Sequence, residues 1–485
     1  MLTYSFDHIG KMPLYEYLYR CIRKDIEAGR LQVGEKLPSK RALARQLGIS
    51  TITVEGAYGQ LTAEGYCRSL PKRGFYVTEA ARVIQREAAQ GARAGEQAAL
   101  AREAEPPQED DAPAYFVDFA EGGVNAENFP FTTWTKLLRQ VVAEEADALI
   151  DRSPGFGAFP LRQAIAAHLA HFRGLVVRPE QIVIGAGTEY LYSLLVQFFG
   201  RDKRFCVENP GYGRIRKIYE SCGACCLRAD LDEAGVWPAE LCAEQAQILH
   251  ISPSHHFPTG IIMPISRRYE LLGWAAAAPD RYIIEDDYDS EFRLTGRPIP
   301  TLMGIDVEGR VIYMNTFSKS LTPTIRISYL VLPEALVGPF TRRLGFYSCT
   351  VSNFEQYTLA RFIESGAFEK HINRMRTLYR KRREKLLSLL RRSRFARNME
   401  IVEHGSGLHF LVRFHRAGSD ASVVSRLAAQ GIHMRSLSSY YAASSPEERE
   451  KASDMQHLFV LDYSSVEESR MPEAVRRIER LWERP

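Results

Sequence analysis

The chain has 485 residues and a formal net charge of +4, and 45% of its residues are hydrophobic while 25% are charged. These proportions are typical of globular proteins and exclude a wholly disordered chain, while the length predicts several domains. Because the longest apolar run, Leu191–Gly200, is too short to cross a bilayer and no export signal opens the chain, we expect a cytoplasmic protein without a membrane span.

The first 79 residues are predicted to form a compact DNA-binding unit. Lysine and arginine outnumber the acidic residues there, which suits contact with a phosphate backbone. Apolar residues at helical spacing predict one helix within 12–31, a second within 38–47 and a third that starts after Ser50. The segment 67–79 contains turn residues between two short strand-like runs and predicts a ribbon. Three helices followed by a ribbon are typical of a winged helix-turn-helix.

Six side chains of this unit are candidates for contact with double-stranded DNA. Polar and basic groups at the start of a recognition helix or on a wing can reach phosphates or base edges. These candidates are Arg41, Ser50, Thr51, Thr53, Lys72 and Arg73. Arg41 could read a base or contact only a phosphate, and the sequence leaves both interpretations open.

Residues 80–113 are rich in Ala, Arg, Glu, Gln and Gly and have no sustained apolar face, so they predict a linker. From 114 to 485, short apolar runs alternate with helical patterns. This alternation indicates βαβ units and a mainly parallel sheet that is buried on both faces. Ligands of such sheets bind beyond the carboxyl ends of the strands. The residues that follow the strands are therefore the candidates for a site.

The cysteines suggest no metal site. Five of the eight lie between Cys206 and Cys242, but no second pair of ligands with metal-binding spacing accompanies them. We expect free thiols that act mainly as small buried hydrophobes.

The residues that follow the expected strands suit one cofactor. A glycine and a threonine open a helix, where backbone N–H groups can hold a phosphate, and a lysine is followed seven residues later by an arginine. Pyridoxal 5′-phosphate takes a lysine for its aldehyde, a carboxylate for its pyridine nitrogen, an aromatic stacking partner and phosphate ligands. In chain order the candidates are Gly187, Thr188, Tyr212, Arg214, His255, Asp286, Tyr288, Ser318, Lys319 and Arg326.

Apart from the linker, the whole chain resembles the MocR/GabR-type regulators. "LPSKRALARQLGIS" and "TVEGAYGQLTAEGY" are similar to GntR-type winged helices, while "PGYGRIR", "PSHHFPTG", "EDDYDSEFR" and "FSKSLTPTIR" resemble fold-type I (class I) aminotransferases. The resemblance implies a GntR-type domain at 1–79, a linker at 80–113, and an α/β aminotransferase-like domain with large and small subdomains at 114–485.

The resemblance also implies roles for the candidate residues. Lys319 would form the Schiff base with pyridoxal 5′-phosphate, and Asp286 would pair with its pyridine nitrogen. Tyr288 would hydrogen-bond the phenolic oxygen, and Tyr212 would stack on the ring. The implied phosphate ligands are Gly187, Thr188, Ser318 and Arg326.

One departure from the family concerns the phenolic oxygen. Aminotransferases read Asn-Pro-Thr-Gly where this chain has Phe257 before Pro-Thr-Gly. The asparagine beside that oxygen is therefore missing, and His255 is its expected substitute.

A second departure concerns the effector. Relatives often carry an arginine in the strand that corresponds to "LFVLDYSS", where this chain has Val460 and Asp462. Arg435 is the candidate replacement, and Arg214 matches the position at which GABA-responsive members hold an effector carboxylate. The missing arginine weighs against a standard α-amino acid as effector.

A cofactor site and a DNA-binding unit in one chain predict a transcriptional regulator. A small amine or amino acid, or pyridoxal 5′-phosphate itself, would be sensed at Lys319 and would alter DNA binding. The resemblance implies a homodimer with the winged helix on the partner subunit. One alternative is an active aminotransferase with a fused DNA-binding domain, and another is a DNA-binding protein whose larger half is a cofactor-free scaffold.

Overall fold

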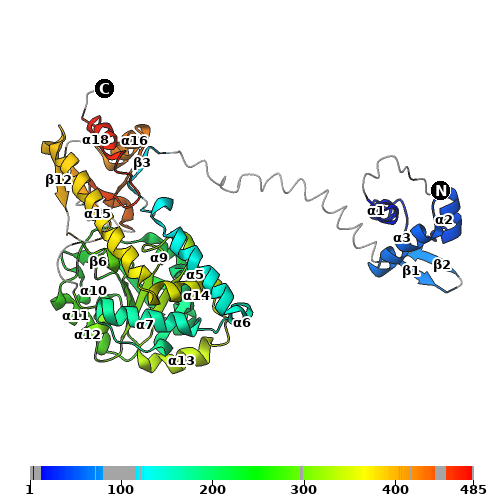
Figure 1. Ribbon diagram of the computed structural model, residues 1–485, viewed down its shortest axis with the longest axis horizontal. Coiled ribbons are helices and arrows are strands. Elements are labelled where there is room, and N and C mark those ends of the chain that lie inside the picture. Colours follow the sequence, from blue (N-terminus) through cyan, green and yellow to red (C-terminus); the bar gives the residue numbers. More distant parts are fainter. Residues whose placement is uncertain are drawn as a thin grey trace. The chain divides into compact units, whose positions relative to one another are not determined.

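The computed structural model describes residues 4, 12–71, 73–79, 115–120, 122–123, 125–294, 299–402, 405, 407–415, 418–442 and 455–482. The chain divides into two compact units, with the boundary between Ala112 and Pro113, and each unit is described by itself (Figure 1). The expected linker at 80–113 and the DNA candidate Lys72 lie outside the described residues.

The first unit is a winged helix-turn-helix, as predicted. Its elements are α1 (Leu14–Glu27), α2 (Lys40–Leu47), α3 (Thr51–Ala63), β1 (Cys67–Leu70) and β2 (Gly74–Val77). Ser39 caps α2 by accepting a hydrogen bond from the N–H of Ala42, and Ser50 caps α3 by accepting one from Ile52. Between the two helices, Gly48 adopts a φ of 68° and ends α2.

The core of this unit lies where the three helices meet the ribbon. Leu18 and Ile22 of α1 and Val54 and Leu61 of α3 are fully buried in it. The hydroxyl of Tyr58 donates a 2.9 Å hydrogen bond to the carbonyl of Pro38. This bond joins α3 to the start of the helix-turn-helix.

The second unit is built on an eight-stranded sheet with the order β4-β11-β10-β9-β8-β5-β6-β7. The five strands from β10 to β6 are parallel, whereas β11 is antiparallel to both of its neighbours. The strands are β4 (Ile182–Gly185), β5 (Arg204–Asn209), β6 (Cys225–Asp232), β7 (Gly235–Val236), β8 (Ile248–Ile251), β9 (Tyr282–Asp286), β10 (Val311–Thr316) and β11 (Ser328–Val331). The predicted α/β class with a mainly parallel sheet is confirmed.

Helices cover both faces of the sheet. Successive side chains of each strand point to opposite faces, so a single strand packs on helices on both sides. Ile182 and Ile184 pack with residues of α7 and α14, while Val183 packs with residues of α8. The helices of this part are α5 (Phe131–Glu144), α6 (Ala146–Ile150), α7 (Phe159–Arg173), α8 (Thr188–Phe199), α9 (Gly213–Ser221), α10 (Pro238–Ala243), α11 (Ile265–Ala276), α12 (Leu302–Ile305), α13 (Glu334–Leu344) and α14 (Asn353–Glu364).

The long helix α15 (Ala367–Arg392) precedes a smaller sheet with the order β12-β13-β16-β15. These strands are antiparallel. Their bounds are β12 (Met399–Val402), β13 (His409–Phe414), β15 (Arg435–Ser436) and β16 (Leu458–Asp462), and α16 (Asp420–Ala429) and α18 (Met471–Glu479) belong to the same region. A separate parallel pair joins β3 (Val117–Asp118) to β14 (Ile432–His433).

The cysteine prediction is partly wrong. All eight cysteines are free thiols, but Cys225 and Cys242 are exposed and only Cys67 and Cys206 are fully buried. Cys225 is the first residue of β6 and lies on the surface. Its neighbours in the sequence did not indicate this exposure. Among the described residues, no group of three or more His, Cys, Asp or Glu side chains could hold a metal ion. That part of the chain also contains no helix long and apolar enough to cross a membrane.

Candidate functional site

Several of the predicted cofactor-site residues follow the carboxyl ends of parallel strands. Asp286 is the last residue of β9 and lies opposite Met314 of the adjacent strand β10. Lys319 follows the end of β10 by three residues, in a turn. Because parallel strands end at the same edge of a sheet, the fold brings the lysine and the aspartate to one edge.

Asp286 is held by its neighbours through one oxygen only. Its Oδ2 accepts a 2.9 Å hydrogen bond from the hydroxyl of Tyr192 and lies 3.4 Å from Nε2 of His250. The other ring nitrogen of His250 lies 2.7 Å from the hydroxyl of Tyr219. The second oxygen, Oδ1, is buried and has no hydrogen-bond partner.

A buried polar atom without a partner costs free energy, so Asp286 Oδ1 fits a ligand that brings an N–H group. A protonated ring nitrogen meets this requirement. The residues present therefore fit the pyridine nitrogen of the predicted cofactor. Sequence reasoning identified Asp286, but it missed Tyr192 and His250, which lie on other elements and carry no motif of their own.

The amine of Lys319 is accessible to such a ligand. The side chain is half-buried, and neither a hydrogen bond nor an ion pair joins its amine to the described residues. Its charge acts on two buried neighbours, His409 and Asp462. Burial, then His255, then the Lys319 charge hold the pKa of His409 well below its usual value. His409 is therefore a neutral imidazole beside the lysine.

A corner that suits a phosphate group lies at the start of α8. Gly187 precedes this helix with a φ of 89°, and Thr188 is its first residue, so the unpaired N–H groups and the helix dipole favour an anion. The guanidinium of Arg326 packs directly on Gly187, and a Cβ at that position would lie 2.4 Å from Nη2. Ser318 belongs to the turn after β10, where its N–H donates to Thr316 Oγ1 at 3.1 Å.

Glu189 is a member of this corner that sequence reasoning missed. Its Oε2 lies 3.0 Å from Arg326 and its Oε1 lies 3.3 Å from Arg214. An acidic residue in the first turn of a helix is common and gave no signal by itself. The candidate effector residue Arg214 therefore shares a carboxylate with a candidate phosphate ligand, and its guanidinium lies 5.7 Å from the centre of the Tyr212 ring.

Tyr212 and Phe257 line another side of the site. The Tyr212 ring is 45% exposed and meets Phe257 edge to face, with their centroids 6.0 Å apart. Phe257 also contacts the rings of His409 and Tyr440. An exposed aromatic face beside a polar site can stack on a planar ligand.

His255, the predicted substitute of the missing asparagine, lies beside Tyr288. The Tyr288 hydroxyl is 3.3 Å from His255 Nδ1, and the same nitrogen is 2.8 Å from Oδ2 of Asp289. Burial, with a smaller contribution from Asp289, raises the pKa of Tyr288 well above its usual value. Tyr288 is therefore a neutral hydroxyl that can donate or accept a hydrogen bond.

Arg435 does not enter the buried part of the site. It lies opposite Val460 in the register between β15 and β16, but its side chain is exposed. Val460 is fully buried with Leu411 and Leu437 and packs on Phe257. The strand position at which relatives carry an arginine is therefore occupied here by a buried apolar side chain.

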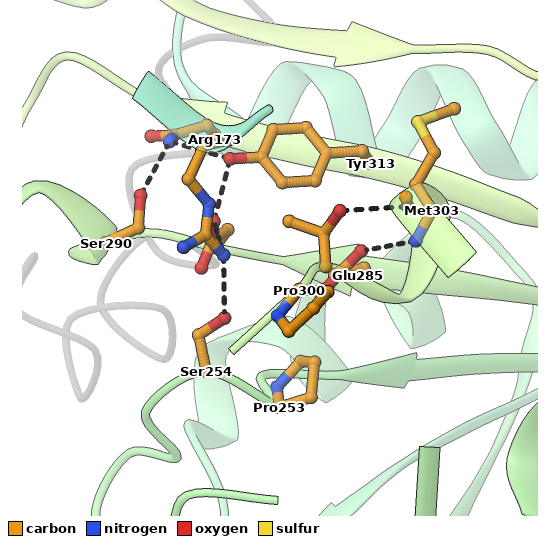
Figure 2. Close-up of polar contacts among 12 residues, drawn as sticks. Arg173, Pro253, Ser254, Glu285, Ser290, Pro300, Met303 and Tyr313 are labelled. Atoms are coloured by element: carbon orange, nitrogen blue, oxygen red, sulfur yellow. Dashed lines mark hydrogen bonds and ion pairs between the residues drawn. The ribbon is translucent and has the colours of Figure 1, made fainter. Parts of the chain in front are cut away.

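A buried polar network holds the residues on each side of Asp286 (Figure 2). Arg173 lies 2.9 Å from Oδ2 of Asp287 and 3.2 Å from the hydroxyl of Ser254. The same Asp287 oxygen accepts a 2.8 Å hydrogen bond from Tyr313. The side chains of Arg173, Asp287 and Tyr313 are almost fully buried, so they fix the end of β9 against α7 and β10.

Glu285 precedes Asp286 and belongs to the same network. It accepts hydrogen bonds from the N–H groups of Leu302 and Met303 at 2.8 and 3.0 Å, as Figure 2 shows. Its Oε1 lies 3.6 Å from the fully buried Arg268, and burial raises the pKa of Glu285 to about 7. The sequence "EDDYDSEFR" therefore contains structural carboxylates as well as the candidate site residue.

The predicted DNA candidates that belong to the described part of the winged helix lie at its surface. Arg41, Thr51 and Arg73 are exposed, and Thr53 is partly exposed. Ser50 is exposed too, but its hydroxyl also caps α3. Sequence reasoning missed Ile52, which is 78% exposed in the first turn of α3 and could contact a thymine methyl group.

Two family models match the chain. "Bacterial regulatory proteins, gntR family" matches residues 14–77, and "Aminotransferase class I and II" matches residues 118–452. The HTH-type transcriptional regulator YdeL of Bacillus subtilis (strain 168) is 37% identical over 97% of this chain and 97% of its own length. The probable rhizopine catabolism regulatory protein MocR of Rhizobium meliloti is 31% identical over 97% of this chain and 94% of its own length.

The larger unit is also similar to solved structures. One is the Pyrococcus horikoshii kynurenine aminotransferase in complex with PMP, with a TM-score of 0.65, 23% identity, and coverage of 76% of this chain and 91% of that one. This likeness shows the fold of the larger unit.

Proposed function

The chain belongs to the MocR-type transcriptional regulators, with pyridoxal 5′-phosphate as the cofactor of the larger unit, and from this premise we propose that it senses a small amine at Lys319. The cofactor is held covalently by the Lys319 amine. A primary amine or amino acid that competes for this attachment, or the cofactor itself, changes the affinity of the winged helix for DNA.

The unpartnered oxygen of Asp286 carries the proposal. It lies at the strand edge that also presents Lys319, and it lacks the one hydrogen bond that a protonated ring nitrogen would supply. Tyr192 and His250 occupy its other oxygen, so the carboxylate is oriented before any ligand arrives. A site that is only a scaffold would have no use for this orientation.

Bound pyridoxal 5′-phosphate supplies an aldehyde that primary amines can exchange onto. Lys319 provides the resident amine, and Arg326 with the start of α8 holds the anionic end. The neutral hydroxyl of Tyr288, fixed by His255, can hydrogen-bond an oxygen on the ring. The exposed aromatic side chain of Tyr212 is available to stack on that ring.

Sensing requires no turnover. An effector shifts the equilibrium between two arrangements of the chain only by its difference in affinity for them. Replacement of the Lys319 amine by an effector changes the charge beside His409 and Asp462 on β13 and β16. These strands of the small sheet are thus the first part of the chain to respond.

Aminotransferase activity is the second candidate function, and the retention of Lys319, Asp286 and Tyr288 favours it. Against it, Phe257 replaces an asparagine and Val460 replaces an arginine of the active relatives. Two relatives that match nearly the whole chain are named as an HTH-type transcriptional regulator and a regulatory protein. We therefore propose regulation as the physiological role, with turnover as a weak residual property.

The proposal includes a domain-swapped homodimer. Tyr212, Arg214 and Arg326 lie at the edge of the site with exposed side chains, as expected where a second subunit completes it. Size-exclusion chromatography with light scattering tests the dimer, and a monomer would contradict this part of the proposal.

The visible absorption spectrum after addition of pyridoxal 5′-phosphate tests the function. The wild type should show a Schiff-base band, and mass spectrometry after borohydride reduction should place the cofactor on Lys319. Lys319→Ala should lose both signals, while Lys203→Ala, whose amine pairs with Asp280, should keep them. DNA from upstream of the protein's own gene should then bind with an affinity that an amine changes in the wild type and not in Lys319→Ala. A wild type without the band and the adduct would refute the proposal.

A further inference from the structure

Asp462 is a buried carboxylate that faces the site from the small sheet. It is the last residue of β16 and is only 6% exposed. It lies opposite His409 in the register of β13 and β16, and side chains in directly opposite positions share one face of a sheet. His409 contacts the rings of His255 and Phe257, so this face looks onto the candidate cofactor site.

The local structure satisfies only one oxygen of Asp462. Oδ1 accepts hydrogen bonds from the N–H and the hydroxyl of Ser464 at 2.8 and 2.5 Å. Oδ2 lies against the backbone of Gly122, where a Cβ would approach it to 2.0 Å. A side chain at residue 122 would therefore collide with the carboxylate of Asp462.

No arginine compensates this charge. Among the described residues, no ion pair includes Asp462. The buried Arg382 donates to the carbonyl of Ser464 instead. Lys319 is the cation that acts on Asp462, since its charge opposes the rise in pKa that burial causes.

The surroundings of Asp462 favour one class of effector, and this conclusion rests on the proposed function. If Lys319 is joined to the cofactor, the ammonium charge that acts on Asp462 is lost, and the carboxyl group stays buried. A buried charge without a partner is costly, and a ligand that brings a cation removes this cost. A ligand that brings a second carboxylate to the same place increases it.

We propose that Asp462 is a specificity-determining residue that selects amines with a second cationic group, so that the effector is a diamine-like compound. The neutral first amine of this compound forms a C=N bond with the cofactor while the C=N bond to Lys319 breaks, so Lys319 is released as a neutral amine. The second ammonium of the compound pairs with Asp462. The partly exposed ring of Phe257, which contacts His409 opposite Asp462, suits the methylene chain between the two amines. A carboxylate at the second position is repelled.

The test is a titration of the cofactor-loaded wild type, followed by visible absorption. The ligands form matched sets. Trimethylenediamine, putrescine and cadaverine are each compared with the monoamine in which a methyl group replaces the second ammonium. Each is also compared with the amino acid in which a carboxylate replaces it, namely γ-aminobutyrate, δ-aminovalerate and ε-aminocaproate.

At least one diamine should bind about tenfold or more tightly than its methyl counterpart, the expected value of a charge-assisted hydrogen bond. Asp462→Asn should bring this preference to within about threefold. Glu467→Gln, which removes an exposed carboxylate paired with Arg470, should keep the preference.

Three results would overturn the inference. The first two are that the wild type binds the monoamines, or the amino acids, as tightly as the diamines or more tightly. The third is that Asp462→Asn still prefers the diamine. If the variant does not fold, the wild-type ligand sets still decide the question. A wild type with no Schiff-base band refutes the proposed function itself, whereas a normal band without a preference for diamines refutes only the role of Asp462.

Discussion

Gly187 lies directly against the guanidinium of Arg326, so closely that a Cβ on residue 187 would be 2.4 Å from Nη2. The glycine also has a φ of 89°, which side chains with a Cβ rarely adopt. Two independent constraints therefore require glycine at the start of α8. Both act on the corner that we assign to the cofactor phosphate.

Gly187→Ala should weaken the binding of pyridoxal 5′-phosphate by about tenfold or more, because the methyl group displaces a bidentate phosphate ligand. Titration followed by absorption measures the loss. Gly273→Ala is the matched control, since nothing lies within 4 Å of a Cβ there and the helix α11 tolerates alanine. Unchanged affinity in Gly187→Ala would show that Arg326 does not hold the phosphate.

Asp286→Asn should weaken cofactor binding by about tenfold. The amide keeps an oxygen toward the ring nitrogen but loses the charge that makes the bond strong. Asp280→Asn, which alters a partly exposed ion pair with Lys203, should bind normally. If Asp286→Asn bound the cofactor as tightly as the wild type, Asp286 would not be the partner of the pyridine nitrogen.

Glu189→Gln should strengthen the binding of pyridoxal 5′-phosphate, by several-fold on the scale of a partly exposed ion pair. The wild-type carboxylate lies 3.0 Å from Arg326 and 3.3 Å from Arg214, so it competes with a phosphate for both. Pyridoxal, which lacks the phosphate, should bind the variant and the wild type equally. A gain that extends to pyridoxal would contradict this explanation.

Glu291→Gln should remove one pH-dependent contribution to the free energy of unfolding. Burial raises the pKa of Glu291 from 4.5 to about 8, so the native state holds this proton between about pH 4.5 and 8 while the unfolded state releases it. The stabilisation by the neutral acid is complete below pH 4.5 and is lost as the pH rises toward 8.

Chemical unfolding across this pH range measures the effect. The free energy of unfolding of the wild type minus that of the variant should fall with rising pH, by at most about 1.4 kcal/mol per pH unit. Burial also raises the pKa of Glu208 to about 8 and of Glu285 to about 7. Both groups are present in both proteins, so their contributions cancel in the difference. A difference that is constant with pH would show that Glu291 is ionised in the native protein.

Arg41→Ala should weaken DNA binding to a similar extent for all sequences and lower the salt slope by about one contact. Arg41 lies exposed in the first turn of α2, outside the recognition helix α3, where a phosphate contact is expected. Arg20→Ala, on α1 and paired with Glu16, is the control. A loss confined to one base position of the operator would instead assign Arg41 to base reading.

The sequence by itself determined the winged helix, the α/β class and most of the candidate site. Ser39 and Ser50 precede helices that they cap, and these bonds are local, so a short stretch of chain is enough to predict them. Asp286 and Lys319 each follow an apolar run. Because parallel strands end at one edge, their meeting could be expected before any contact was known.

The tertiary structure decided the rest, because the contacts join residues far apart in the chain. Glu189 meets Arg326, 137 residues away, and the pairing of His409 with Asp462 depends on the register of two strands. No local pattern encodes such distances or the burial that goes with them. The exposure of Arg435 and the burial of Asp462 therefore appear only in the folded chain. Because of these two observations, we propose the carboxylate of Asp462, in place of Arg435, as the group that recognises the effector.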